Sequence, residues 1–369
     1  MNVHGTARAT ALPTADDMGG EYADFGCEVN AISPEKLFQR YEASRFMYPA
    51  KGERLAPFWP LIMDNWKRAR QAGELLNCVV TYQAPGGGWA SLTKWRTTHE
   101  GWHSQHLVSA GSRGAARNVL LAAQAVAIRE GRTSAVQNWF RPDNPFPALA
   151  FGSIVDGIGS EAAAVIPGDY LMMPLSLCQS FADAEPTGKH PAEELDGGRC
   201  PELAALAVRC RGAVYAHGEG LDRDDLLLGD VDRLYGLVGL RRYRRIWAQR
   251  AADGRIHAAA VAYRGPFGFN FSFLENRCDL LIDPALDSER AQRAARSLLA
   301  ATCRAYEAFP LGSIPVVAGP GQARSLVALG GEHIEAYTQG IWLARGFGAW
   351  CRHISDFYRQ HSHAPARAR

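Results

Sequence analysis

The sequence lacks several features that mark common classes of protein. Its eight cysteines include no pair with Cys-x-x-Cys spacing, and no histidine falls at a zinc-site interval near them. This pattern excludes a structural zinc site and a dense disulfide framework, so we expect buried thiols in a reducing compartment and no metal. No apolar run approaches the length of a membrane span, and residues 1–20 contain no apolar signal core. We therefore expect a cytoplasmic protein without a membrane partner.

Lysine is scarce as well, and arginine supplies most of the positive charge. Lysine occurs only at positions 36, 51, 67, 94 and 189. The 40 Lys and Arg residues nearly balance the 38 Asp and Glu residues, which leaves a net charge of +2. Such a balance provides no overall attraction to nucleic acid. The Gly-x-Ser-x-Gly, Gly-x-Gly-x-x-Gly and Walker phosphate-loop patterns are also missing, so those hydrolase and nucleotide-binding motifs are excluded.

With 369 residues the chain is longer than a typical domain with a single hydrophobic core, so we expect two domains. Low periodicity predicts a mobile tail at residues 1–30 and a C-terminal tail at 353–369. A stretch rich in Pro, Gly and charge predicts a linker at 183–200. The two domains would then span residues 31–182 and 201–352.

Both halves of the chain predict the same order of elements: helices, meander strands, a strand, a helix, a strand, a helix and a strand. In the first half we expect helices from Ser33-Pro34 and over 58–72, strands at 75–82, 89–95 and up to Ala110, a helix from near Arg117 to Gly131, a strand at 134–140, a short helix at 146–154 and a strand at 163–173. In the second half we expect helices over 201–237, strands at 244–249, 256–263 and 269–282, a helix at 288–308, a strand at 313–317, a short helix at 321–329 and a strand at 336–344.

The segment Gly111-Ser-Arg-Gly-Ala-Ala116 is the best candidate for a binding site. An apolar strand, Leu107 to Ala110, leads into it, and an apolar-periodic helix follows. Backbone N–H groups point outward at such a helix start, and the helix dipole favours negative charge there. The segment therefore predicts an anion or phosphate seat. A tight turn between strand and helix, without a ligand, is the alternative.

This order of elements resembles that of the GNAT-type acyltransferase superfamily. The chain looks like two such domains in tandem, an α/β fold in which each domain is a mixed twisted sheet flanked by helices. In that family a Gln/Arg-x-x-Gly-x-Gly/Ala loop holds the pyrophosphate of acetyl-CoA. Gly114 and Ala116 match this pattern, whereas Gly111 stands where Gln or Arg is usual. The resemblance implies that the cofactor, acetyl-CoA or another acyl-CoA, is bound by Ser112, Arg113, Gly114, Ala115 and Ala116.

The corresponding loop of the second half, Ile282 to Ser288, has no glycine and carries two aspartates. Since these carboxylates would repel a pyrophosphate, the coenzyme A site is expected in the first half only. Family members also place a Tyr, as general acid, seven residues after an Asn that opens the penultimate helix. With Asn144 as that Asn, position 151 is Phe, so this hydroxyl is missing.

A general base is expected just before the third strand, in the segment Thr98 to His103. Glu100 and His103 are the candidates, because a carboxylate or a near-neutral imidazole can take the proton of an attacking ammonium. In the alternative interpretation His99, His103 and His106 are ordinary residues at the rim of a hairpin or facing solvent.

Two cationic segments leave alternatives open. Arg45, Tyr48 and Lys51 combine charge and aromatic rings suited to an anionic ligand, or they form an exposed turn between helices. The run Arg241-Arg-Tyr-Arg-Arg245 has an Arg-x-x-x-Arg spacing that can clamp phosphates, but a solvated strand edge explains it adequately.

The leading hypothesis for the function is an acyl-CoA-dependent N-acyltransferase, with the cofactor bound by the first domain. The acceptor would be a small-molecule amine or a protein amine. The alternative is a catalytically inactive GNAT-like ligand-binding or regulatory module, since a fold does not by itself determine a function.

Overall fold

The first half of the chain forms the elements that its start and turn residues predict. Ser33 caps the first helix, because its hydroxyl accepts a hydrogen bond from the N–H of Lys36 and Pro34 takes the first helical position. The computed structural model describes residues 25–184, 191–319 and 321–361. The helices of this half are α1 (Pro34–Ala43), α2 (Pro49–Leu55), α3 (Trp59–Gln71), α4 (Arg113–Arg129), α5 (Pro145–Gly152), α6 (Ile154–Ile158) and α7 (Leu175–Ala184). Its strands are β1 (Cys27–Val29), β2 (Asn77–Gln83), β3 (Trp89–Thr98), β4 (Gly101–Ala110), β5 (Ala135–Phe140) and β6 (Ala163–Pro174).

The second half repeats this order. Asp287 caps its longest helix by accepting a hydrogen bond from the N–H of Arg290. The helices are α8 (Pro201–Arg211), α9 (Ala213–Gly218), α10 (Gly229–Gly236), α11 (Ser288–Tyr306), α12 (Ala323–Ala328) and α13 (Phe347–His361). The strands are β7 (Glu193–Glu194), β8 (Tyr243–Arg250), β9 (Ile256–Arg264), β10 (Cys278–Ile282), β11 (Ser313–Ala318) and β12 (Glu332–Leu343).

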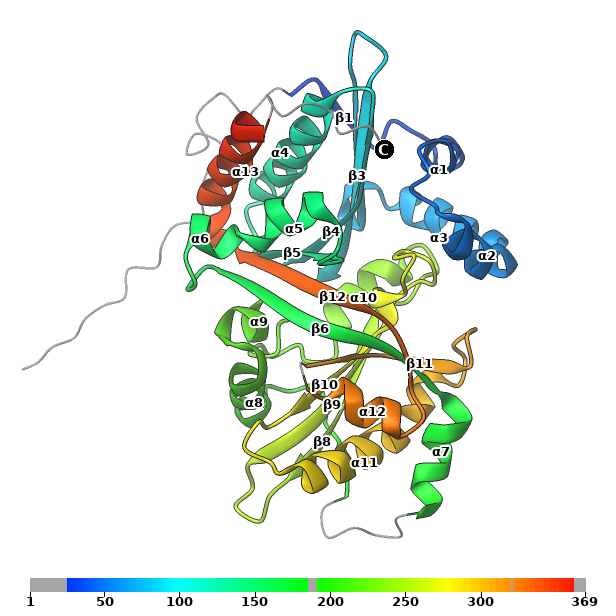
Figure 1. Ribbon diagram of the computed structural model, residues 1–369, viewed down its shortest axis with the longest axis vertical. Coiled ribbons are helices and arrows are strands. Elements are labelled where there is room, and N and C mark those ends of the chain that lie inside the picture. Colours follow the sequence, from blue (N-terminus) through cyan, green and yellow to red (C-terminus); the bar gives the residue numbers. More distant parts are fainter. Residues whose placement is uncertain (1–24, 185–190, 320, 362–369) are drawn as a thin grey trace, which may run out of the picture.

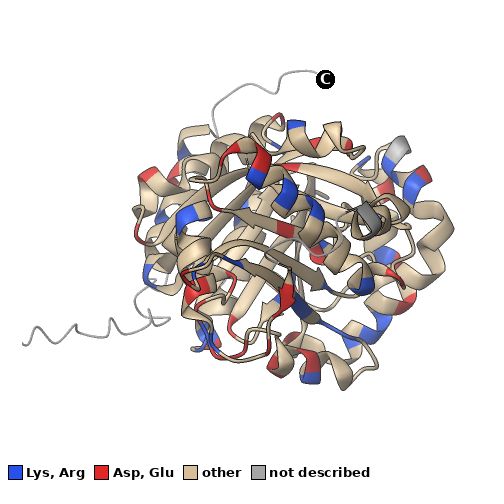
Figure 2. Ribbon diagram, turned by 90° about the horizontal axis from the view of Figure 1, so that it is seen from below, with Lys and Arg blue, Asp and Glu red and all other residues tan. Residues whose placement is uncertain are grey.

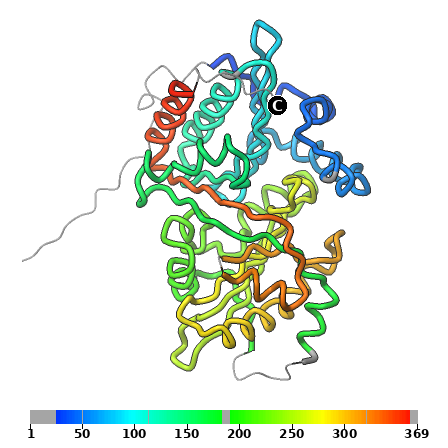
Figure 3. The backbone as a smooth tube through the Cα atoms, viewed as in Figure 1, coloured from blue at the N-terminus to red at the C-terminus, as the bar shows by residue number. Residues whose placement is uncertain are grey.

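All of these strands form one sheet, and the two halves exchange their last strands within it. The strand order is β1-β2-β3-β4-β5-β12-β6-β11-β10-β9-β8-β7. β12, from the second half, pairs antiparallel with β5, and β6, from the first half, pairs antiparallel with β11. β6 and β12 also pair with each other, and they run side by side across the middle of the molecule (Figures 1 and 3). The halves are thus joined by a mutual exchange.

The helices that follow the exchanged strands are exchanged too. α13 packs against α4 of the first half, and α7 packs against α11 of the second half. Trp350 and Ile354 of α13 accordingly share a core cluster with Val119 and Leu120 of α4. Because α4 packs on β2, β3 and β4 as well as on α13, it is apolar on more than one face, as expected of a buried helix.

Several boundaries differ from those expected from the sequence. The predicted tail at 1–30 ends in a strand, because Cys27–Val29 pairs with β2; residues 1–24 lie outside the described residues. The predicted tail at 353–369 begins inside α13, whose apolar face packs on α4, and residues 362–369 lie outside the described residues. Within the predicted linker, Glu193–Glu194 pairs with β8, while 185–190 are not described. The central helix starts at Arg113 rather than near Arg117.

The chain carries nearly equal numbers of basic and acidic residues, and its cysteines form no disulfide. Seen from below, acidic and basic residues alternate along the ribbon without separating into regions of one sign (Figure 2), in keeping with the net charge of +2. The eight cysteines are free thiols, five of them buried. Within the described ranges no helix is long and apolar enough to cross a membrane, and no group of three or more His, Cys, Asp or Glu side chains could hold a metal ion.

Candidate functional site

The two parallel strands of the first half separate partway along their length. β4 and β5 pair only from Gly101↔Ala135 to His103↔Gln137. β4 also contains one extra residue relative to β3, since Gln105 faces Thr93 while Val108 faces Ser91. His106 lies in this bulge with a φ of 54°. A bulge bends its strand and re-aims side chains, and here it accompanies the divergence of β4 from β5.

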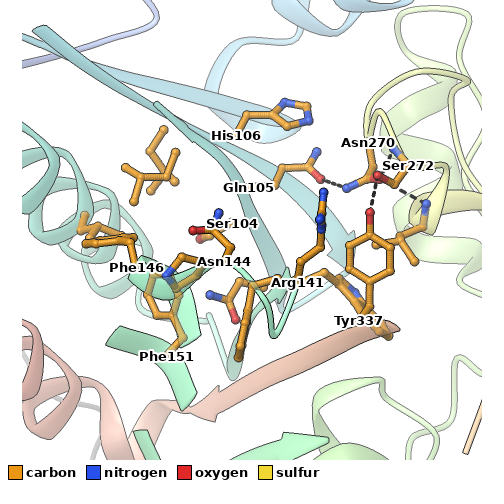
Figure 4. Close-up of a pocket in the computed structure, with 18 of the residues that line it drawn as sticks. Ser104, Gln105, His106, Arg141, Asn144, Phe146, Phe151, Asn270, Ser272 and Tyr337 are labelled. Atoms are coloured by element: carbon orange, nitrogen blue, oxygen red, sulfur yellow. Dashed lines mark hydrogen bonds between the residues drawn. The ribbon is translucent and has the colours of Figure 1, made fainter. Parts of the chain in front are cut away.

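A cavity of about 210 Å³ lies in the gap between these strands. The cavity is lined from both faces of the sheet. Its lining residues belong to, or lie next to, three clusters of buried side chains. On the side of α4, α5 and α13 the lining is apolar and is formed mainly by Leu92, Leu107, Leu120, Phe146, Phe151, Trp342 and Trp350. On the other side it is polar and is formed mainly by Lys51, Gln105, His106, Arg141, Asn270, Ser272 and Tyr337. Figure 4 displays this division, with Phe146 and Phe151 opposite Asn270 and Tyr337.

Six buried polar atoms that belong to lining residues have no hydrogen-bond partner among the described residues. They are His106 Nδ1 and Nε2, Gln124 Nε2, Asn138 Oδ1, Trp139 Nε1 and Trp350 Nε1. Buried polar groups in proteins are almost always paired, and each unpaired group carries a desolvation cost. A cluster of such atoms around one cavity leaves donors and acceptors that a polar ligand or ordered water could pair with.

The imidazole of His106 is held by aromatic rings. It stacks on Phe271 at a centroid distance of 4.3 Å, and Trp66 lies parallel to it at 5.8 Å. Tyr41 and Phe46 meet it edge-on. Burial, with the charge of Lys51 next in weight, lowers the pKa of His106 well below 6.5. The ring is therefore neutral at physiological pH, and one of its nitrogens is a free proton acceptor.

A loop from the second half completes the polar side. The sequence predicted a strand over 269–282, but only Cys278–Ile282 is a strand. Residues 267–272 form turns and bends, and Leu274–Asn276 forms a single 3₁₀ turn. The Asn270 carboxamide oxygen accepts hydrogen bonds from the N–H groups of Ser272 (2.8 Å) and Leu274 (3.3 Å). Its Nδ2 donates to Oε1 of Gln105 at 2.7 Å. The loop is thus fixed against β4.

The exchanged strand β12 contributes Tyr337 to the same side. The Tyr337 hydroxyl donates to Oε1 of Glu335 at 2.7 Å and lies 2.6 Å from the Ser272 hydroxyl oxygen. Glu335 Oε2 in turn lies 3.2 Å from Nε of Arg141. Sequence reasoning missed both Tyr337 and the 270–274 loop, because no local pattern shows that residues of the second half complete a cavity of the first.

The predicted anion seat lies at the N-terminus of α4, on the helix that also lines the cavity. Gly111 has a φ of 73°, and Ser112 precedes α4 without a side-chain cap. A Cβ added at Gly114 would meet no atom within 4 Å, so the space beside the first turn is open. Leu120 lies about 9 Å further along the helix, at 1.5 Å per residue, and lines the cavity. Ala115 and Ala116 are buried, and the binding role of residues 112–116, Arg113 included, stays a prediction.

Glu100 and His103, the predicted bases, are engaged in ion pairs at the other end of β4. Glu100 pairs with Arg223. His103 pairs through Nδ1 with Glu275, which also binds Arg242 at 2.5 Å. Burial raises the pKa of Glu275, but the charges of Arg242 and His103 outweigh burial and lower it below its usual value. Neither predicted base is among the described residues that line the cavity.

Asn144 and Phe151, which matched the family pattern around the missing Tyr, both line the cavity. The ring at position 151 faces it without a hydroxyl. For Lys51 the sequence left two roles open, binding an anionic ligand or lying in an exposed turn. In the structure Lys51 lines the cavity as well.

The arginine run is a solvated edge at alternate positions only: Arg241 is exposed and Arg245 is half-buried, and both are held in ion pairs. Arg242 and Arg244 are buried, and Arg244 donates to the carbonyl oxygens of Leu226, Glu219 and Gly220. Arg241 pairs with Asp232, and Arg245 pairs with Glu194. All four guanidinium groups are therefore used within the fold.

The equivalent gap of the second half is filled by side chains. β10 and β11 pair in parallel only at Cys278↔Val316 and Asp279↔Val317. Beyond this point Arg211 donates to the carbonyl oxygen of Val317 at 3.0 Å and lies 3.4 Å from Asp279. The Tyr215 hydroxyl donates to Asp279 at 2.8 Å. The cavity therefore belongs to the first half.

No protein-family model matches the chain, and no curated protein matches it in sequence. Solved structures that match include a Drosophila protein from a structural genomics consortium, with 12% identity over 87% of this chain and 99% of that chain and a TM-score of 0.42. A GCN5-related N-acetyltransferase from Sphaerobacter thermophilus has 11% identity over 73% and 81%, with a TM-score of 0.33. Saccharomyces cerevisiae N-myristoyltransferase with bound myristoyl-CoA has 9% identity over 72% and 66%, with a TM-score of 0.33.

The chain is similar in fold to GNAT-type acetyltransferases. At these identities the likeness extends to the fold alone. The two halves of the chain share one sheet, and the order of strands, helices and parallel pair is the same in both.

Proposed function

We propose that the protein is an acyl-CoA-dependent N-acyltransferase whose reaction occurs in the cavity between β4 and β5. The observation that carries this proposal is a cavity that crosses the sheet of the first half and is bordered by unpaired buried polar atoms. Such a passage lets two substrates approach one reaction point from opposite faces of the sheet. The filled gap of the second half supports a single site per chain.

The residues present fit an acyl-CoA. The open first turn of α4 around Gly114 suits a pyrophosphate, because free N–H groups and the helix dipole favour an anion there. Beyond His103, the edge of β4 that faces the gap has no strand partner among the described residues, so its backbone groups can bind an extended amide chain. The apolar side, with Leu120, Phe151 and Trp350, suits an acyl group.

We assign the role of general base to His106 in preference to Glu100 or His103. Bound acyl-CoA supplies a thioester carbonyl carbon. As the amine nitrogen forms its bond to that carbon and the C–S bond breaks, the neutral imidazole accepts the proton that the nitrogen loses, and the thiolate leaves. His106 suits this step because it lines the cavity and has free nitrogens, whereas Glu100 and His103 are held in ion pairs.

Calorimetric titration with acyl-CoAs from acetyl to decanoyl tests the binding step. A ligand at a hundred times its Kd should stabilise the folded protein by about 2.7 kcal/mol. Gly114→Glu should abolish binding, because it adds a negative charge where the pyrophosphate is expected. Gly114→Gln, which has the same shape without the charge, is the matched control and should retain it. Absence of binding by every acyl-CoA would overturn the proposal.

A ligand-binding module without catalysis is the second candidate, favoured by the phenyl ring of Phe151 where the family carries a Tyr. It predicts that an acyl-CoA binds but that no free coenzyme A thiol appears with any amine. A thiol-release assay on the same samples separates the two functions.

A further inference from the structure

The cavity is positively charged in its lining. Lys51 and Arg141 line it, and no Asp or Glu is among the described residues that do. Arg141 shares its charge with Asp143 and with Glu335, at 2.5 and 3.2 Å. For Lys51, no carboxylate of the described residues lies within 4.0 Å of its ammonium group. Of the two cations that line the cavity, Lys51 is therefore the one without an ion-pair partner among the described residues, although Glu335 attracts it from farther away.

Lys51 is held at the cavity wall by aromatic rings rather than by a counter-ion. Its Nζ lies 5.3 Å from the ring centroid of Tyr48 and 6.0 Å from that of Phe46. Rings at these distances attract a cation through their quadrupoles, but they do not neutralise it. Burial, the largest effect, lowers the pKa of Lys51 to about 8; the charge of Glu335 opposes this shift, whereas the charges of Arg54 and Arg141 add to it. An anion bound inside the cavity would offset the free-energy cost of burying the charged ammonium group.

Lys51 and His106 both lie next to the ring of Phe46. The Phe46 ring contacts the His106 ring edge-on at a centroid distance of 5.6 Å, as well as the Lys51 ammonium group. A small molecule that bridges the proton acceptor and the cation therefore needs an amine and an anionic group only a few bonds apart. A polyamine or another purely cationic amine would instead be repelled by Lys51, whereas the charge of Arg141 is balanced by Asp143 and Glu335.

We propose that the acceptor is a small amino acid, whose carboxylate binds the Lys51 ammonium group while its amine faces His106. This inference rests on the proposed acyl transfer and specifies its acceptor. The new bond joins the amine nitrogen to the carbonyl carbon, the C–S bond breaks, and the proton passes to His106. The carboxylate takes no part in the chemistry and emerges in the N-acyl amino acid.

The test compares glycine, leucine and phenylalanine with their carboxamides, and with butylamine and putrescine, at a saturating concentration of the acyl-CoA found by calorimetry. We expect kcat/KM for the acids to exceed that for the carboxamides about 10- to 100-fold, since a hydrogen bond to a charged group contributes at this level. Lys51→Met should remove this advantage and leave the carboxamides within about twofold. Lys51→Arg should restore most of it, and Lys36→Met, on the exposed face of α1, should have no effect.

The outcomes separate this inference from the proposed function. Equal use of acids and carboxamides would overturn the acceptor assignment while acyl transfer stands. It would also be overturned if Lys51→Met raised the KM for acyl-CoA instead, because the cation would then hold a cofactor phosphate. If no acyl-CoA binds, the proposed function fails, and titration of the amino acids into wild type and Lys51→Met decides whether the carboxylate site exists. Equal melting temperatures of the variants verify that they fold.

Discussion

At the scale of single residues, the position of His106 follows from one extra residue in β4. The bulge turns the imidazole into a pocket of four aromatic rings, where water cannot solvate a charged ring. His103, only three residues earlier, lies in a regular part of the strand and forms an ion pair with Glu275. The two histidines therefore differ in chemistry because of their backbone and not because of their sequence neighbours.

His106→Phe tests the role of the imidazole with the aromatic stack preserved. We expect kcat to fall by about 100-fold or more, as for loss of a general base, with acyl-CoA affinity unchanged. Steady-state kinetics at saturating acyl-CoA measures this. A variant with the kcat of wild type would contradict the assignment of the base.

The same variant should also change the response to acid. Because burial holds the pKa of His106 well below 6.5, the unfolded chain takes up a proton at a pH at which the folded protein does not. The stability of wild type relative to His106→Phe should therefore fall as the pH drops below 6.5, by up to about 1.4 kcal/mol per pH unit. Urea unfolding at pH 7.5 and 5.5 gives the difference.

At the scale of secondary-structure elements, local patterns predicted most of the order but not the pairing. Ser33-Pro34, the hairpin glycines and the apolar periodicity of 288–308 are signals within a few residues, and the corresponding elements are present. The run from Phe269 to Phe273 looked like a strand because it is aromatic. Its shape instead depends on the Asn270 side chain and on a φ of 61° at Phe273, which no apolar pattern encodes.

The partners of β6 and β12 could not be predicted either. Both strands are apolar enough to lie in the middle of a sheet, and their sequences do not specify which half they complete. The residues of the site that depend on this pairing could not be predicted for the same reason. Motifs pointed to Asn144 and Phe151, which line the cavity, whereas Tyr337 reaches it only through the exchange; the anion seat before α4 stays a prediction.

The gap between β10 and β11 is occupied by charged and polar side chains, those of Arg211, Tyr215 and Asp279. Burial raises the pKa of Asp279, but Arg277 and Arg211 outweigh burial and keep the carboxylate charged. Removing one partner of a buried ion pair leaves the other charge uncompensated, at a cost of about 3–5 kcal/mol.

Asp279→Asn should therefore destabilise the fold by about 3–5 kcal/mol at pH 7, as measured by urea unfolding. Glu193→Gln removes a carboxylate from the exposed pair with Arg250 and should cost less than about 1 kcal/mol. The advantage of wild type over Asp279→Asn should be complete above the unfolded pKa of Asp, about 4, and should shrink below it. Similar costs for the two variants would show that the network is not a buried support.

At the scale of the whole molecule, the exchange makes the two halves depend on each other. The cavity of the first half takes Trp342 from β12, Trp350 from α13 and Asn270 from the loop before β10. The second half in turn needs β6 between β12 and β11. A core formed from both halves cannot open on one side while the other remains intact.

We therefore expect one cooperative thermal transition, in which the calorimetric and van't Hoff enthalpies agree, despite the repeated architecture. Asp279→Asn, in the second half, should lower the temperature of this entire transition by several degrees. An acyl-CoA bound in the first half should raise it again in the same variant, because ligand binding stabilises whatever unfolds with its site. Two separate transitions, of which the ligand moves one and the substitution the other, would instead mean that the halves unfold independently and that the exchanged strands do not couple them.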